Sequence, residues 1–130
     1  MKKHSVDYSE SMEDYLEAVR MLGGEKVKSV DIATQIGVTK ASVNHAVNLL
    51  IEAGYVDKEP YGTISLTEEG RRVAERVLRR HVTLKAFLKD TLGLEEEQAD
   101  KEACGIEHHV SDETIRRLEN WIQSCKQHQS

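Results

Sequence analysis

Three side chains with metal-binding chemistry lie close together in the stretch CGIEHHVSDE, near the end of the chain. Cys104, Glu107 and His108 are spaced i, i+3 and i+4, so they share one face if this stretch is helical. A thiolate, a carboxylate and an imidazole all bind divalent metals. The spacing alone leaves three interpretations open: a metal site, a catalytic site, or the polar edge of an ordinary helix.

Two other segments carry possible partners for this face. Asp14 and Glu17 follow Glu10 and Glu13 at helical spacing, a run that by itself is best explained as a solvated helix face. His81 lies on an apolar stripe, where a lone histidine is usually a satisfied core residue. Counted together with the first three, these side chains could supply six oxygen, nitrogen and sulfur ligands. That set suits one or two first-row metals and is too rich in carboxylate for a structural zinc site.

The first half of the chain has the pattern of a winged helix-turn-helix. Apolar spacing predicts helices over about 9–22, 29–36 and 39–53. We expect Ser29 to cap the second helix, Val30 to lie on its buried face, and Gly37 to end it in the left-handed conformation. The run YVDKEPYGTISL then predicts a β-hairpin around 60–62. This order of elements delivers its third helix into a DNA major groove.

The outward side of that third helix indicates DNA binding. No acidic residue lies between Asp31 and Glu52, whereas an ordinary solvated face usually carries glutamate. Small and amide side chains allow close approach and bond base edges, and lysines contact phosphates. The candidate DNA-binding residues are Thr39, Lys40, Ala41, Ser42, Asn44, His45 and Asn48, with Lys28 and Lys58 as phosphate contacts beside Lys40.

The second half predicts three further helices, beginning near Thr67, over 94–109 and over 111–126. On the middle one we expect Ala99, Ala103, Ile106 and Val110 to be buried. The last carries an apolar stripe that fits a dimer surface or packing within the chain almost equally well.

Charge and composition limit the kinds of partner that the protein can have. The net charge of −5 argues mildly against nucleic acid, but residues 71–89 carry seven bases against one acid and residues 90–119 carry ten acids against three bases. We expect no membrane partner, because no apolar run approaches the roughly 18 residues of a membrane helix and no signal peptide opens the chain. Two cysteines form no disulfide framework, which favours the cytoplasm.

Four stretches, SMEDYLEAV, VDIATQIGVTKASV, LTEEGRRVAERVLRRH and ACGIEHHVSDE, together resemble the diphtheria-toxin-repressor family of metal-dependent regulators, most closely its manganese-transport-regulator branch. The resemblance implies a homodimer, not an enzyme, that binds double-stranded operator DNA when Mn(II) or Fe(II) is bound and represses metal-homeostasis genes. It also implies a mainly α fold, with a winged helix-turn-helix domain over 1–73 and an all-helical metal-binding and dimerisation domain over 74–130.

Carried over by position, the family's primary metal site falls on Asp14, Cys104, Glu107 and His108. The neighbouring site of the manganese branch falls on Glu17 and His81, with Glu107 shared. Lys85 and Asp100 stand where the iron branch has a glutamate and a histidine, so that branch's ancillary site is not expected. The end of the chain at Ser130 also leaves no room for the SH3-like third domain of many iron-branch members.

The ligand set is a hybrid of two branches. Asp14 matches the manganese branch, whereas Cys104 matches the iron branch and replaces a glutamate. A thiolate is softer than a carboxylate and favours Fe(II), Co(II) or Zn(II) over Mn(II). We therefore expect Fe(II) or Mn(II), one or two per subunit, with Co(II) or Zn(II) also possible. Affinity should fall at low pH, because Cys104 must lose its proton.

Two other functions stay open on the sequence alone. Carboxylate-bridged metal pairs also activate water, so a dimetal hydrolase is an alternative, although no substrate cleft is obvious. The other alternative is a winged-helix regulator that senses no metal, its acidic stripes being merely solvated.

Overall fold

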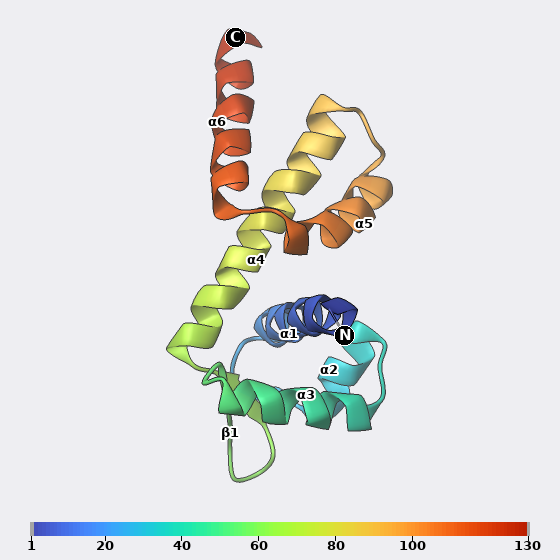
Figure 1. Ribbon diagram of the computed structural model, residues 1–130, viewed down its shortest axis with the longest axis vertical. Helices are drawn as coiled ribbons and strands as arrows, with labels where there is room; N and C mark the ends of the chain where they lie inside the picture. Colours follow the sequence, from blue (N-terminus) through green and yellow to red (C-terminus); the bar gives the residue numbers. More distant parts are fainter. Residues whose placement is uncertain (1, 130) are drawn as a thin grey trace. The chain divides into compact units, whose positions relative to one another are not determined.

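A computed structural model describes the backbone of residues 2–129 and the side chains of residues 12–127 (Figure 1). The chain forms two compact units, Met1–Arg76 and Val77–Ser130. The elements of the first are α1 (Lys2–Met21), α2 (Ser29–Ile36), α3 (Lys40–Glu52), β1 (Val56–Lys58) and β2 (Ile64–Leu66). Helix α4 (Glu68–Ala86) crosses the boundary and is followed by the π-helical turn η1 (Phe87–Thr91), α5 (Glu96–Ile106), the 3-10 turn η2 (Glu107–His109) and α6 (Asp112–Gln129).

The first unit is a winged helix-turn-helix, as the sequence predicts. Leu16 from α1, Ile32 from α2, and Val43 and Leu50 from α3 are fully buried in one apolar core. The expectation for Val30 is wrong, since this side chain is 54% exposed and Ile32 takes the buried position. Burial of Val43 and Leu50 turns the opposite side of α3 to solvent.

The turn between α2 and α3 is fixed by two local features. Gly37 has a φ of 84°, and its N–H donates back to the last turn of α2. The Thr39 hydroxyl accepts a hydrogen bond of 3.1 Å from the N–H of Ser42, which caps α3. Ser29 is the first residue of α2 rather than its cap, and Lys28 takes the N-cap position without a side-chain hydrogen bond.

The wing is the expected two-stranded antiparallel hairpin. Val56 pairs with Leu66 and Lys58 with Ile64, and Val27 adds a bridge to Ile64. At the tip, Gly62 has a φ of 84°, a conformation that glycine adopts without strain. The tip presents Tyr61, which is 96% exposed, to solvent.

A glycine in the first turn of α4 packs against the start of the wing. A Cβ at Gly70 would lie 1.9 Å from the carbonyl oxygen of Tyr55, so no larger residue fits there. The Thr67 hydroxyl caps the start of α4 by accepting from the Gly70 N–H at 3.1 Å, and it donates to the carbonyl of Gly54 at 2.7 Å. The first turns of α4 are therefore held directly against the start of the wing.

The second unit consists of the C-terminal part of α4 with α5 and α6. Its core contains Leu84, Leu88, Ala99, Ala103 and Ile115. Phe87 and Trp121 meet edge to face with ring centroids 5.8 Å apart. Among the described residues, no helix is both long and apolar enough to span a membrane.

Ion pairs join α4 to α6 within this unit. Arg79 forms a two-pronged contact with Glu119, at 3.0 Å from Nε to Oε2 and 2.6 Å from Nη2 to Oε1. Thr83 donates to the same carboxylate at 3.1 Å, and Arg80 pairs with Asp112 at 3.0 Å. The hydrogen bond from Arg79 holds the pKa of Glu119 below its ordinary range.

The Glu119 contact predicts an acid-dependent loss of stability. Because the folded-state pKa lies below the ordinary value, the contact stabilises the fold above that value, and the stabilisation is lost as the pH falls through the folded pKa. Glu119→Gln should therefore lower the melting temperature by a few degrees at most at pH 7, and by progressively less as the pH falls below the ordinary pKa of glutamate. Thermal unfolding of wild type and variant across this range measures the difference, with Glu97→Gln as the control. A difference that persists in acid would contradict this explanation.

Candidate metal centre and nucleic-acid interface

Three elements of the second unit bring potential metal ligands together. His81 on α4, Cys104 on α5 and Glu107 on η2 offer a nitrogen, a sulfur and an oxygen that all lie within 4.8 Å of one another. We call these three side chains the metal-ligand cluster. Cys104 is exposed, His81 is partly buried and Glu107 is buried, so solvent reaches the cluster at Cys104 and not at Glu107.

The end of α5 differs from the sequence expectation. The α-helix stops at Ile106, and Glu107–His109 continue as the tighter 3-10 turn η2. Ile106, which we expected to be buried, is 36% exposed, whereas Glu107 is fully buried. The change of helix type therefore gives the inward position to a carboxylate instead of an apolar side chain.

The buried carboxylate of Glu107 is only partly satisfied. Its Oε1 lies 2.7 Å from Nδ1 of His81. Its Oε2 is buried and has no hydrogen-bond partner among the described residues, although Nε2 of His108 lies 3.5 Å away. A buried polar oxygen without a hydrogen bond is costly. A cation held by these residues would remove that cost, so the donor set fits a divalent metal.

His81 shows that the cluster already favours positive charge. Its pKa is raised to about 9, first by the hydrogen bond to Glu107, against the effect of burial, and then by the hydrogen bond to Asp100. Nε2 of His81 lies 2.8 Å from Oδ1 of Asp100. The lone histidine on an apolar stripe is thus held between two carboxylates. Sequence reasoning did not select Asp100, because periodicity does not show which residues of two helices meet.

The acidic candidates of the first unit lie on α1. Asp14 and Glu17 are one turn apart and half-buried, and Glu13 beside them is also half-buried. The side chain of Glu10 falls outside the described residues. Half-burial of three acidic side chains is not what an ordinary solvated face shows.

The candidate DNA-binding residues all lie in the first unit, and their side chains are exposed. All nine are exposed: Lys28, Thr39, Lys40, Ala41, Ser42, Asn44, His45, Asn48 and Lys58. A groove of about 480 Å³ lies between α2, α3 and the wing, bordered by Lys28, Lys40, Asn44, Lys58 and Tyr61. Sequence reasoning missed Tyr61, although an aromatic residue between Pro60 and Gly62 at a hairpin tip could have marked it.

Two family models match the chain in succession. The "Iron dependent repressor, N-terminal DNA binding domain" matches residues 7–64. The "Iron dependent repressor, metal binding and dimerisation domain" matches residues 67–129. Together they account for both compact units.

Relatives of similar length are identical to the chain at more than a third of the aligned residues. An uncharacterized HTH-type transcriptional regulator of Methanocaldococcus jannaschii is 38% identical over 121 residues, which cover 91% of this chain and 97% of the relative. The HTH-type transcriptional regulator MntR of Shouchella clausii is 35% identical over 122 residues, covering 92% and 85%.

Solved structures share the fold. The manganese regulator SloR superposes with a TM-score of 0.78 at 29% identity, and T. acidophilum IdeR with a TM-score of 0.74 at 34% identity. These matches cover 86% and 85% of this chain, which spans 53% of the length of each structure. The chain therefore belongs to the iron-dependent-repressor, or diphtheria-toxin-repressor, family of metal-dependent transcriptional regulators, which are not enzymes, and sides with its manganese-transport-regulator branch.

Proposed function

We propose that the protein is a metal-activated DNA-binding repressor of genes for manganese or iron homeostasis. The observation that carries the proposal is the buried carboxylate of Glu107, with an unpartnered oxygen beside the imidazole of His81 and the thiol of Cys104. An oxygen, nitrogen and sulfur donor set at a solvent-accessible position suits a first-row divalent cation.

The proposed ligands come from both units. Following the family resemblance, Asp14, Cys104, Glu107 and His108 hold one cation, and Glu17 and His81 hold a second with Glu107 shared. Cys104 in place of a carboxylate shifts the preference toward Fe(II), with Mn(II) also accepted. We propose one or two cations per subunit.

The proposed coupling to DNA is electrostatic. The carboxylates of Asp14, Glu17 and Glu107 repel one another until their charge is neutralised, and a bound cation supplies that charge. A cation held by these carboxylates would offset the repulsion and would tie α1 of the DNA-binding unit to the second unit. A typical allosteric coupling of about 1–3 kcal/mol changes DNA affinity by about 5–150-fold.

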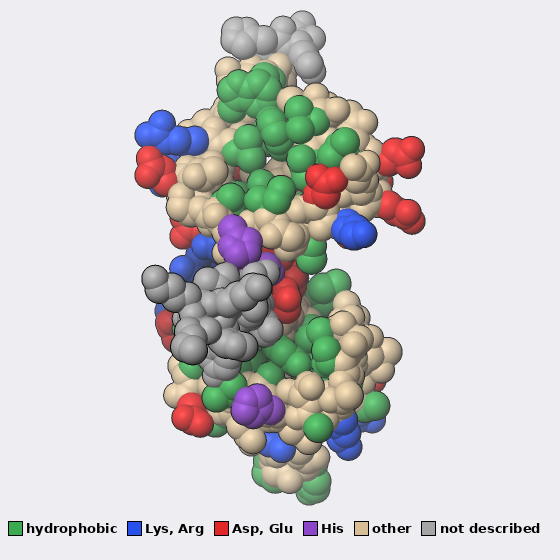
Figure 2. All heavy atoms as spheres, turned by 45° about the vertical axis from the view of Figure 1, so that its right-hand side comes forward, with side chains coloured by type: hydrophobic (Ala, Val, Ile, Leu, Met, Phe, Trp, Pro, Cys, Tyr) green, Lys and Arg blue, Asp and Glu red, His purple; other side chains and the backbone are tan. Residues whose placement is uncertain are grey.

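The proposed partner is double-stranded operator DNA, bound by a homodimer. The exposed residues of α3 enter the major groove, with Lys28, Lys40 and Lys58 on phosphates. Figure 2 shows hydrophobic side chains gathered on one face of the second unit. Three large apolar residues of this unit are about half exposed: Val82 (56%), Leu92 (57%) and Trp121 (47%). We infer that such apolar surface is covered by a second copy, and that the protein works in the cytoplasm, where the thiols of Cys104 and Cys125 stay reduced.

One experiment tests sensing, metal preference and DNA coupling together. The chain is titrated anaerobically with Mn(II), Fe(II), Co(II) or Zn(II), and its binding to a fluorescein-labelled duplex, selected from a random pool in the presence of Mn(II), is followed by anisotropy. We expect DNA affinity to rise with at least one of these metals. DNA binding that ignores all four, with no heat of binding in calorimetry, would support a regulator that senses no metal.

A truncated ligand should uncouple metal from DNA. The His108 side chain is almost fully buried beside Glu107, so His108→Ala removes one proposed ligand from the centre. We expect this variant to remain a folded dimer by sedimentation and circular dichroism and to lose metal-stimulated DNA binding. His109→Ala, at the exposed neighbouring position, is the matched control and should behave as wild type. If metal still stimulates DNA binding by His108→Ala as it does in wild type, the coupling mechanism is wrong.

A further inference from the structure

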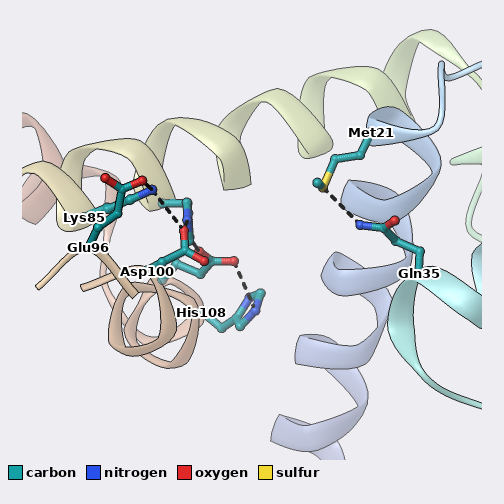
Figure 3. Close-up of polar contacts among 8 residues, drawn as sticks. Met21, Gln35, Lys85, Glu96, Asp100 and His108 are labelled. Atoms are coloured by element: carbon teal, nitrogen blue, oxygen red, sulfur yellow. Dashed lines mark hydrogen bonds and ion pairs between the residues drawn. The ribbon is translucent and has the colours of Figure 1, made fainter. Parts of the chain in front are cut away.

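A chain of polar and charged side chains leads from the metal-ligand cluster along α4 and α5. It begins with Glu107 and His81, 2.7 Å apart, and continues to Asp100, 2.8 Å from the other ring nitrogen of His81. Lys85 lies 3.4 Å from Asp100 and 3.7 Å from Glu96. Figure 3 shows Lys85 pointing toward both of these carboxylates. One side chain of α4, His81, is therefore held at both ring nitrogens by two different segments.

The two nitrogens of His81 face different surroundings. Nδ1 faces Glu107 inside the cluster, whereas Nε2 faces the exposed carboxylate of Asp100. A histidine binds a metal through the lone pair of one ring nitrogen while the other carries the proton. In the metal-free protein both nitrogens face carboxylate acceptors, and a cation that replaced the proton on Nδ1, the nitrogen directed at the cluster, would leave the donation from Nε2–H to Asp100 intact.

Lys85 keeps Asp100 in this supporting role. The Lys85 ammonium and the His81 ring share the same oxygen, Oδ1 of Asp100. The hydrogen bond from His81 and the charge of Lys85 lower the pKa of Asp100, so it is an ionised acceptor. A positive charge already beside this carboxylate also disfavours a second cation there.

We propose that Asp100 is a positioning residue of the metal centre: it accepts from Nε2–H of His81 and so orients the imidazole with Nδ1 as the ligand nitrogen, and Lys85 anchors Asp100 in place. The inference rests on the proposed function, because it needs His81 to be a ligand. It adds a residue to the centre that does not itself touch the metal.

Zinc titration of the full chain tests this role. Zn(II) affinity is measured by competition with a chromophoric chelator, and the ring nitrogens of ¹⁵N-histidine-labelled protein are read by long-range ¹H–¹⁵N NMR. In wild type we expect Zn(II) on Nδ1 of His81 and a proton on Nε2. Asp100→Ala should weaken Zn(II) binding by about 10–100-fold, the usual effect of losing such a carboxylate, and let Zn(II) bind through either ring nitrogen of His81.

Two variants separate orientation from charge. Asp100→Asn keeps an acceptor oxygen, and should retain the wild-type ring pattern and recover most of the affinity. Glu97→Ala removes one negative charge from an exposed position of the same helix and should change affinity less than twofold. Equal losses of Zn(II) affinity in Glu97→Ala and Asp100→Ala would overturn the positioning role. An Asp100→Ala variant with unchanged affinity, or Zn(II) bound through Nε2 of His81 in wild type, would overturn it as well. Wild type that binds neither Zn(II) nor Mn(II) would overturn the proposed function as well.

Discussion

Glu107→Gln is expected to remove metal-dependent DNA binding altogether. Glutamine matches the shape of glutamate and still accepts from Nδ1 of His81, but it carries no negative charge toward a cation. Glu107 is proposed to bind both cations. Its replacement should therefore weaken metal binding by more than the ~10–100-fold that follows the loss of a supporting carboxylate.

Thermal unfolding gives a second measurement that does not need DNA. A metal at 100 times its dissociation constant stabilises a folded protein by ~2.7 kcal/mol, which at this chain length is a shift of about 10 °C. Wild type should show such a shift with Mn(II) or Fe(II), and Glu107→Gln should show none. Glu97→Gln, which removes an exposed charge nearby in the sequence, should keep both the shift and the DNA response. A Glu107→Gln variant that still melts higher with metal would remove Glu107 from the centre.

The sequence indicated which residue types could form the centre, but not how Glu107 is placed. The spacing of Cys104, Glu107 and His108 assumed one α-helix through His109, with Ile106 on its buried side. The chain instead tightens into η2 after Ile106, which buries Glu107 and exposes Ile106. Such a change at a helix end depends on packing and leaves no mark in apolar periodicity.

Short elements show the same limit in the DNA-binding unit. Helix α2 has eight residues, so two or three apolar side chains set its buried face, and the pattern admits either Val30 or Ile32 at the centre. The turn and the wing were predictable because glycine and threonine act there through local conformation, as at Gly37, Thr39 and Gly62. Contacts between helices, such as that of Asp100 with His81, lie beyond local patterns.

Ser42→Glu is expected to maintain or raise the stability of the fold and to lower its affinity for DNA. Thr39 caps α3 through the N–H of Ser42, so a glutamate at 42 completes a capping box with Thr39. Its charge also lies near the positive end of the helix, where a carboxylate is favourable. Stability should therefore stay equal or rise by about 0.5 kcal/mol.

DNA binding by the same variant should fall steeply. Ser42 is exposed on the side of α3 proposed to face the major groove, so the new carboxylate would meet phosphates and base acceptors. A like charge buried against a partner costs several kcal/mol, and ~3 kcal/mol corresponds to roughly a 100-fold loss of affinity. Anisotropy with the selected duplex in the presence of Mn(II) measures the loss, and chemical denaturation measures the stability.

Two control variants show whether a loss of DNA affinity in Ser42→Glu comes from contact at α3 or from net charge. Asn120→Glu makes the same change of net charge on the exposed side of α6 opposite its apolar stripe, and should leave DNA affinity within about twofold if local contact rather than net charge is responsible. Ser42→Ala keeps the helix neutral and should lose far less than Ser42→Glu. If Ser42→Glu binds DNA as wild type does, α3 is not the reading helix, because a carboxylate cannot sit in a major groove without cost.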